Sequence, residues 1–196
     1  MKEKQQKILE AALKLFSERG FQGTSTAEIA KTAGVATGTL FHYFNTKEEL
    51  INCLYLHIKK NMINEVTGDY DENRTFKDNL KDLWLKFTHY GLNESEKFKF
   101  ILTFHCSPYI TSLTKEQLDT QTESVLKVYM KGIENQKIKE IPFEMAMEYF
   151  WGNVVSTVSY FENYHKNLNN KNLNLAFELF WDGISSNPNS NGVHSI

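Results

Sequence analysis

The chain has 196 residues, of which 13% are aromatic and 23% charged, and it carries a net charge of −2. That length can bury a core in one domain or two small ones, and the balanced charge excludes a protein that is basic throughout. The two cysteines, Cys53 and Cys106, lack the spacing of a metal knuckle or a disulfide framework. The first residues are charged and amphipathic, and no run of about 18 apolar residues occurs. We therefore expect a soluble cytoplasmic protein.

Charge is distributed unevenly along the chain. Residues 1–47 carry seven Lys or Arg and four acidic residues, a net +3, whereas residues 48–196 carry fifteen and twenty, a net −5. A modest local excess of positive charge suits contact with phosphates, and an acidic remainder discourages indiscriminate coating of DNA.

The first predicted helix covers about residues 3–19 and ends at Gly20. Its apolar residues recur at helical spacing and predict one buried face, formed by Ile8, Ala11, Ala12, Leu15 and Phe16. The lysines before and within it fit a solvated face, with contact to a phosphate as the alternative; they are Lys2, Lys4 and Lys7.

Residues 25–44 predict two short helices joined by a tight turn. Ser25 and Glu28 have the spacing of a capping box, so a helix begins near Thr26. Its buried stripe is Ile29, Ala30 and Ala33, and Gly34 stands where a left-handed residue ends a helix. The next helix opens at Ala36 or Thr37, with an inward face of Leu40, Tyr43 and Phe44. Its outward residues would be Thr37, Gly38, Thr39, Phe41 and His42.

This layout is typical of a helix-turn-helix, whose second helix lies in the major groove of DNA. Gly38 would let the backbone approach a phosphate closely, while Thr37 and Thr39 offer hydroxyls to phosphates or base edges. Periodicity alone is equally compatible with an ordinary helical hairpin in a bundle.

The remaining elements are also predicted to be helical. Thr46 and Glu49 form a second predicted capping box, so a helix runs from there to about Val66, and Lys47 with the free N–H groups at its start could hold a phosphate. The helical pattern lapses at residues 67–71. Further helices are expected at about 76–91, 93–105, 114–135, 143–165 and 173–184. No segment alternates with period two for long enough to form a strand, so the predicted class is all-α. Residues 186–196 are expected to be disordered.

The helix predicted from Phe143 lacks a charged face. No charged residue lies between Tyr149 and Phe161, and both the stripe through Phe150 and Val154 and the stripe through Tyr149 and Tyr160 are uncharged. Such a helix is usually buried on more than one side, and this one is too short to cross a bilayer. A second copy of the chain is the partner we expect.

The run from Ile8 to Leu50 closely resembles the N-terminal DNA-binding domain of the TetR family of bacterial transcriptional regulators. The resemblance covers about the first quarter of the chain. The chain departs from the family pattern at Ala36, where a Ser or Thr cap is usual, at Thr37, where Lys or Arg is common, and at Phe41, where a Tyr often donates to a phosphate. The matching positions are Phe16, Gly20, Phe21, Thr24, Ser25, Ile29, Ala30, Ala33 to Val35, Gly38 to Leu40, Tyr43, Phe44 and Lys47 to Leu50.

The resemblance implies a three-helix helix-turn-helix domain over residues 1–47 and a helical ligand-binding and dimerisation domain over 48–185. It assigns phosphate contacts to Thr24, Ser25, Tyr43 and Lys47. It also implies that the last two helices, about 143–165 and 173–184, pair with a second copy in a four-helix interface. A C2 homodimer would place two reading helices on a palindromic operator, so the expected function is a ligand-responsive transcriptional repressor.

The implied effector is a small molecule whose identity the sequence does not give. Its candidate lining residues are apolar with a few polar groups, which favours an uncharged or largely apolar ligand, although each also fits simple core packing. They are Trp84, Phe87, Tyr90, Phe100, Phe104, Tyr109, Tyr129 and Asn153.

Two rival interpretations stay open. Glu162 and His165 form an E-x-x-H pair, but a di-iron bundle needs two such motifs and two further carboxylates. Nucleophile-elbow, phosphate-loop and zincin motifs are absent, so we predict no catalytic residue, metal or cofactor. The rivals are a helical metal protein or enzyme, and a protein-interaction module that does not bind DNA.

Overall fold

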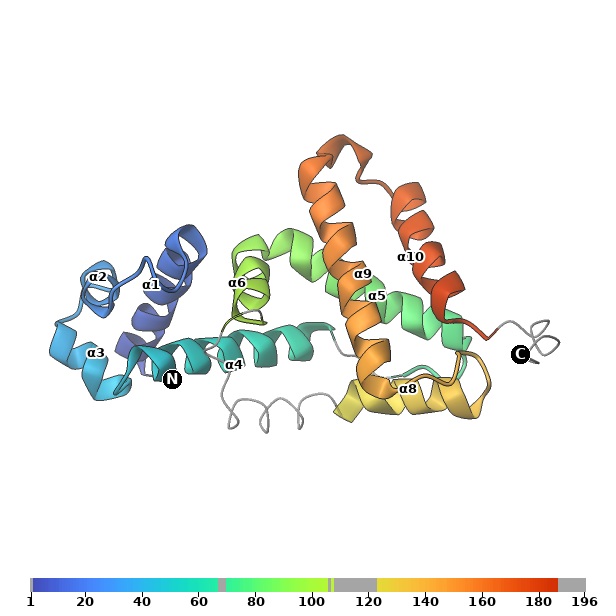
Figure 1. Ribbon diagram of the computed structural model, residues 1–196, viewed down its shortest axis with the longest axis horizontal. Helices are drawn as coiled ribbons and strands as arrows, with labels where there is room; N and C mark the ends of the chain where they lie inside the picture. Colours follow the sequence, from blue (N-terminus) through green and yellow to red (C-terminus); the bar gives the residue numbers. More distant parts are fainter. Residues whose placement is uncertain (1, 67–69, 106, 108–122, 187–196) are drawn as a thin grey trace, which may run out of the picture. The chain divides into compact units, whose positions relative to one another are not determined.

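The computed structural model describes residues 2–66, 70–105, 107 and 123–186, and within these ranges it is helical (Figure 1). The predicted all-α class is confirmed, and the one β-bridge of the described residues joins Ile138 to Ser185. The predicted helix start at 114 and the tail from 187 lie outside the described residues. The elements are α1 Glu3–Arg19, α2 Thr26–Thr32, α3 Thr37–Tyr43, α4 Lys47–Val66, α5 Phe76–Asn93, α6 Ser95–His105, α8 Glu123–Glu134, α9 Phe143–Asn163, the 3₁₀ turn η1 His165–Asn167, and α10 Asn170–Ile184.

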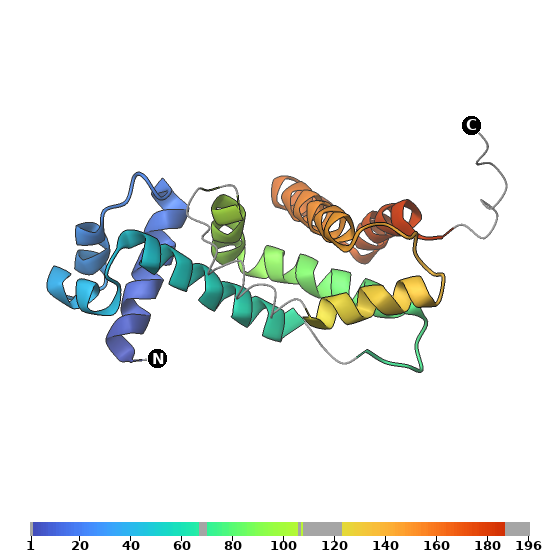
Figure 2. The ribbon, with the colours of Figure 1, turned by 60° about the horizontal axis from the view of Figure 1, so that its bottom comes forward.

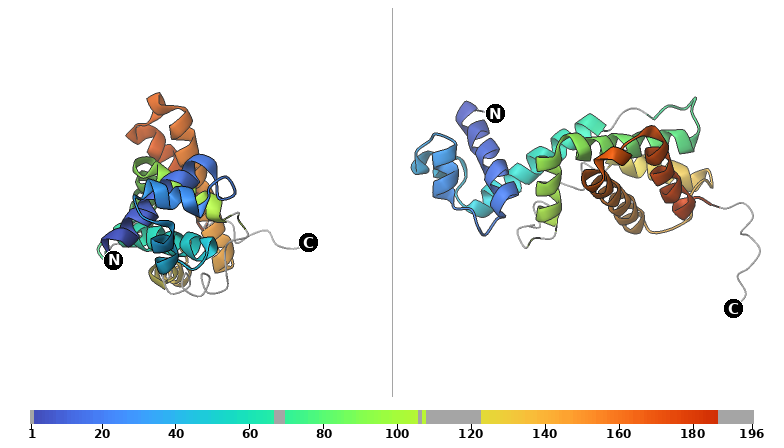
Figure 3. Two further views of the ribbon diagram at one scale, coloured as in Figure 1. Left: turned by 90° about the vertical axis from the view of Figure 1, so that its left-hand side faces the viewer. Right: turned by 90° about the horizontal axis from the view of Figure 1, so that it is seen from above.

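The first compact unit comprises residues 1–64 and 94–121, so it holds α1 to α3, nearly all of α4, and α6. The right view of Figure 3 shows α1, α2 and α3, in blue, gathered at one end of this unit. The face predicted for α1 is buried, as expected. Phe21 contacts both Phe16 and Phe100, with ring centroids 5.2 and 5.6 Å apart, and the Ser17 hydroxyl donates to the Glu96 carbonyl at 3.3 Å. These contacts attach α6 to α1, so this unit extends beyond the boundary predicted at residue 47.

The second compact unit comprises residues 65–93 and 122–196, with α5 and α8 to α10. α9 and α10 form an antiparallel hairpin, seen edge-on in Figure 2 and from above in Figure 3. α5 packs against this hairpin through Trp84, which is fully buried and whose indole N–H donates to the Asn153 side-chain oxygen at 2.8 Å. The Trp84 ring also lies 5.7 Å from that of Phe177. The core of this unit is therefore aromatic.

Several helix ends differ from the predicted ones. α10 begins at Asn170 rather than about 173, because the Asn169 side chain accepts the Asn172 N–H at 3.0 Å and caps the helix. α9 ends at Asn163, since Tyr164 leaves the helical conformation with φ −129° and ψ 59°. His165 consequently lies in η1, and it does not share a helix with Glu162.

The N-terminal cap of α4 differs from the predicted capping box of Thr46 and Glu49 in the group that the Glu49 side chain binds. Thr46 Oγ1 accepts the Glu49 N–H at 3.0 Å, as a capping box requires. The Glu49 carboxylate, however, accepts the backbone N–H and side-chain amide of Asn45, at 2.8 and 3.0 Å. The cap therefore also holds the residue before Thr46, close to the end of α3.

Candidate nucleic-acid interface and cavity

Local hydrogen bonds fix the turn between α2 and α3. The Ser25 hydroxyl accepts the Glu28 N–H at 3.2 Å and the Glu28 carboxylate accepts the Ser25 N–H at 3.0 Å, which confirms the predicted capping box. Hydrogen bonds from Ser25, and then the positive charge of Arg19 at 3.1 Å, lower the pKa of Glu28. Gly34 has a φ of +67°, a conformation that suits glycine, and the Val35 N–H returns to the Ala30 carbonyl at 3.0 Å. These contacts set the direction in which α3 leaves the turn.

α3 presents its predicted outward residues at the surface. Leu40 is fully buried and Phe44 nearly so, and these two side chains hold the inward side of α3 in the core. On the other side, a Cβ placed on Gly38 would meet no atom within 4 Å, and Phe41 is 43% exposed. Thr37 and His42 are also exposed, while Thr39 and Tyr43 are half-buried. The exposed side of α3 therefore carries small residues at the start of the helix and aromatic residues further on.

The four residues assigned to phosphates differ in their surroundings. Ser25 is exposed, but Thr24 is only 2% exposed and its hydroxyl oxygen lies 2.9 Å from the Gly20 carbonyl oxygen. The Lys47 ammonium donates to the carbonyl of Phe21, which ties the start of α4 to the turn after α1. Contacts of these residues with phosphates stay predictions. The structure already gives Thr24 and Lys47 partners within the first unit.

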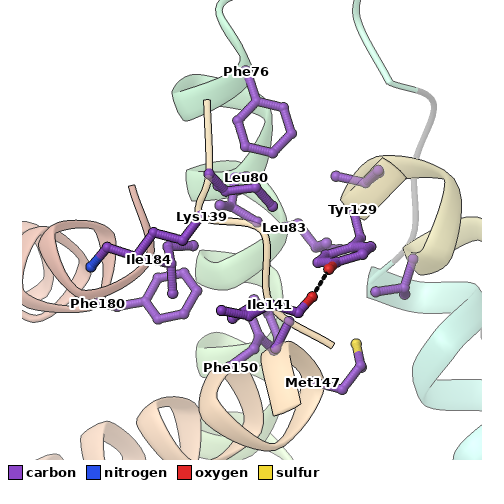
Figure 4. Close-up of a pocket in the computed structure, with 14 residues that line it drawn as sticks. Phe76, Leu80, Leu83, Tyr129, Lys139, Ile141, Met147, Phe150, Phe180 and Ile184 are labelled. Atoms are coloured by element: carbon purple, nitrogen blue, oxygen red, sulfur yellow. Dashed lines mark hydrogen bonds between the residues drawn. The ribbon is translucent and has the colours of Figure 1, made fainter. Parts of the chain in front are cut away.

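A small apolar cavity lies in the second unit, between α5, α8, α9, α10 and the segment that joins α8 to α9 (Figure 4). Its volume is about 50 Å³. The Tyr129 hydroxyl, from α8, donates to the Ile141 carbonyl across one side of it, as the dashed line in Figure 4 shows. The Lys139 ammonium donates to the Gly183 carbonyl at 2.7 Å, and the Lys139 N–H donates to the Ile184 carbonyl at 2.8 Å. These two bonds attach the joining segment to the end of α10.

The structure does not gather the predicted ligand residues around one opening. Tyr129 lines the cavity of Figure 4, and Asn153 lines a separate groove between α9 and α10. The other described candidates are buried in the cores of the two units, and Tyr109 lies outside the described residues; the buried ones are Trp84, Phe87, Tyr90, Phe100 and Phe104.

Sequence reasoning missed the segment that closes this cavity. Ile138, Lys139 and Ile141 lie between two helices, where no helical period indicates an inward face. The available signal was the presence of two isoleucines among the charged residues Lys137, Lys139 and Glu140 of a short linker.

The hairpin of α9 and α10 leaves large apolar side chains exposed. Tyr149 and Tyr160 on α9 are 45% and 43% exposed, and Leu175 and Leu179 on α10 are 58% and 64% exposed. A groove of about 330 Å³ runs between the two helices and is lined in part by Tyr160, Leu175 and Leu179. We call this surface the hairpin face. Its α9 side lies within the charge-free stretch from Tyr149 to Phe161.

Two further classes of site do not occur within the described part of the chain. None of its helices combines the length and the apolar character needed to cross a bilayer. Nor do three or more His, Cys, Asp or Glu side chains of these residues come together in a way that could hold a metal ion.

Comparison with known proteins bears on these features directly. Residues 8–54 match the family model of bacterial regulatory proteins of the TetR family. The fatty acid metabolism regulator protein of Bacillus subtilis (strain 168) is 28% identical over 175 residues, which cover 81% of this chain and 85% of the relative. The crystal structure of a TetR family transcription regulator from Shewanella sp. PV-4 superposes with a TM-score of 0.87 at 28% identity, covering 94% of this chain and 99% of that one.

A second similar structure was solved with a ligand. It is the transcriptional regulator FadR from Bacillus subtilis in complex with stearoyl-CoA, with a TM-score of 0.71 and 22% identity, covering 91% of this chain and 98% of that one. At that identity the similarity shows a shared fold.

The helix-turn-helix geometry and these matches define a DNA-binding transcriptional regulator of the helix-turn-helix class. More narrowly, residues 8–54 match the family model of bacterial regulatory proteins of the TetR family, and 94% of the chain is similar to a solved TetR family transcription regulator.

Proposed function

We propose that the protein is a ligand-responsive repressor that binds a palindromic operator as a homodimer. The observation that carries the proposal is the open side of α3, where a Cβ added to Gly38 would meet no atom within 4 Å and the flanking threonines offer hydroxyls. This surface would enter the major groove, with Thr37, Gly38 and Thr39 nearest the DNA and Phe41 and His42 at the rim.

The hairpin face supports dimerisation. Four large apolar side chains, each more than 40% exposed, lie on two adjacent helices, and the first of these, α9, carries no charge between Tyr149 and Phe161. Contiguous exposed apolar surface of this kind marks interaction sites. A second copy would cover it by the same face, and the resulting C2 symmetry would present two α3 helices to two half-sites.

The proposed effector is a largely apolar small molecule of the fatty acid class. One relative that matches 81% of this chain is a regulator of fatty acid metabolism, and the similar FadR structure holds stearoyl-CoA. The second unit of this chain contains an apolar cavity. Release from DNA requires that the effector bind one arrangement of the dimer more tightly than the DNA-bound arrangement.

Selection of duplexes from a random pool tests both the DNA-binding role of α3 and the symmetry of the bound site. We expect a palindromic consensus, with affinity that falls steeply as salt rises. A consensus without dyad symmetry, or no enrichment at all, would refute the proposed mode of binding.

A pair of matched variants tests the hairpin face. Leu175 and Met145 are both 58% exposed, but Leu175 lies on the hairpin face and Met145 on the first turns of α9, between two glutamates. We expect Leu175→Arg to sediment as a monomer and to bind the selected duplex at least about 100-fold more weakly, because one half-site alone retains little affinity. Met145→Arg should remain dimeric. Equal behaviour of the two variants would contradict the proposed interface.

A further inference from the structure

Phe41 is an exposed apolar side chain on the helix that is proposed to enter the major groove. It is 43% exposed, and no other large apolar side chain among the described residues of the first unit is as exposed. A single apolar side chain on a general surface needs no explanation. This one lies on α3, where the next residue toward the core, Leu40, is fully buried. Its place in the fold therefore makes its exposure informative.

Phe41 shares a face of α3 with residues that are proposed to lie nearest the DNA. It lies four residues after Thr37 and three after Gly38, and residues at these separations are neighbours on one face of a helix. Thr37 is exposed, and a Cβ added to Gly38 would meet no atom within 4 Å. A duplex that meets the start of α3 on this face is thus within reach of the phenyl ring, which lies about one turn further along the helix.

The chemistry of the phenyl ring limits which groups of DNA it can recognise. The ring has no polar N–H or O–H donor and no oxygen or nitrogen acceptor, so it cannot form the usual hydrogen bonds with a phosphate or with the polar atoms of a base edge. The apolar group that a base pair presents in the major groove is the C5-methyl group of thymine. Contact between the ring and this methyl group removes both from water, which favours binding.

We propose that Phe41 recognises the C5-methyl group of one thymine in each half-site of the operator. This inference rests on the proposed function, because it requires α3 to lie in the major groove. It adds the base and the atom that the chain recognises, and it makes Phe41 a determinant of sequence specificity. The selected duplexes should consequently contain a T·A pair at the same position of each half-site.

Replacement of thymidine by deoxyuridine tests the contact, because it removes the methyl group and keeps the hydrogen-bonding groups of the base pair. Each thymine of the selected duplex is replaced in turn, in both half-sites together, and affinity is measured by fluorescence anisotropy at one salt concentration. At the contacted position we expect a loss of roughly four-fold per half-site, or about 15-fold for the dimer. Equal affinity for all the substituted duplexes and the parent duplex would overturn the proposal.

Variants of Phe41 test whether this side chain makes the contact. Phe41→Ala should bind the thymine and deoxyuridine duplexes equally well, because the group that contacts the methyl is gone. Phe41→Leu keeps an apolar side chain and should retain part of the preference for thymine. Any effect of the methyl group on the duplex itself is common to all the proteins and cancels in this comparison. A full preference for thymine in Phe41→Ala would refute the assignment.

His42 provides the control on the same helix. It is also exposed and aromatic, but it lies about 100° further around the helix axis, and its ring packs against that of Tyr43 at 5.4 Å. His42→Ala should keep the preference for thymine at the contacted position, whatever its overall affinity. Loss of the preference in both His42→Ala and Phe41→Ala would contradict a specific role for Phe41. Thermal unfolding establishes that each variant is folded.

The same measurements separate this inference from the proposed function. If a palindromic duplex is bound but no methyl effect depends on Phe41, the assignment to Phe41 fails and the proposed function stands. If a single subunit binds a lone half-site and shows a Phe41-dependent loss of roughly four-fold with deoxyuridine, the assignment stands and the proposed homodimer fails.

Discussion

Replacement of Gly38 by alanine separates the stability of α3 from its contact with DNA. Gly38 lies inside the helix without a positive φ, and a Cβ there would meet no atom within 4 Å. The folded chain therefore accepts the methyl group without strain. Because alanine is the better helix former, Gly38→Ala should stabilise the protein by up to about 1 kcal/mol and raise Tm by about 2–4 °C.

The same methyl group should weaken DNA binding. It would project from the open side of α3 and hold the backbone roughly 1–2 Å further from the duplex, which takes a hydrogen bond of about 2.9 Å beyond its useful range. Loss of one such contact, at about 1.4 kcal/mol, is a factor of about ten per half-site and about one hundred for a dimer. Fluorescence anisotropy on the selected duplex and on a random duplex measures the loss and its sequence dependence.

A substitution in the neighbouring helix serves as the control for Gly38→Ala. Thr32 is exposed at the end of α2 and stands outside the proposed contact set, and Thr32→Ala also improves helix propensity. We expect it to raise Tm slightly and to leave DNA affinity unchanged. A stabilised Gly38→Ala protein with unchanged affinity would show that this side of α3 does not meet DNA, and the assignment of the reading surface would be wrong.

Two other predictions concern the helical units. Asn153→Leu leaves the indole N–H of fully buried Trp84 without its acceptor, so chemical denaturation should show a loss of about 1–3 kcal/mol, and adding Trp84→Phe should recover part of it because the unsatisfied donor is then gone. Burial lowers the pKa of Lys59 from 10.5 to about 8. Between these pH values the folded chain binds fewer protons than the unfolded chain. The free energy of unfolding should therefore rise as the pH rises from 8 to 10. Lys59→Met should abolish that rise and, at pH 7, relieve a penalty of about 3 kcal/mol; an unchanged pH profile in this variant would refute the assignment to Lys59.

The helix-turn-helix could be predicted from the sequence because its signals are local. Ser25 and Glu28 are three residues apart, Gly34 ends α2 where a left-handed residue was expected, and the spacing of Leu40 and Phe44 set the orientation of α3. Each of these signals operates within one or two turns of helix. Of the residues predicted to face outward on α3, Thr37, Gly38, Phe41 and His42 are accordingly exposed, and Thr39 is half-buried.

The cavity could not be predicted, because it depends on contacts between distant residues. Ile138 pairs with Ser185 across the end of α10, and this pairing makes the α8–α9 segment a wall. Periodicity within a helix carries no information about such a partner. The start of α10 was misplaced for a different reason: the Asn169 cap was present in the sequence but lies among several asparagines with equal capping ability.

The contact between Phe21 and Phe100 limits how the DNA-reading part can be exchanged between proteins. A chimaera that takes residues 1–66 and joins them to a foreign sensor leaves α6 behind, and with it the ring that covers Phe16 and Phe21. Two aromatic side chains that are now at most 6% exposed would then face water or a mismatched neighbour. A transferable reader of this protein therefore consists of α1 to α4 together with α6, two pieces that the chain separates by an entire helix.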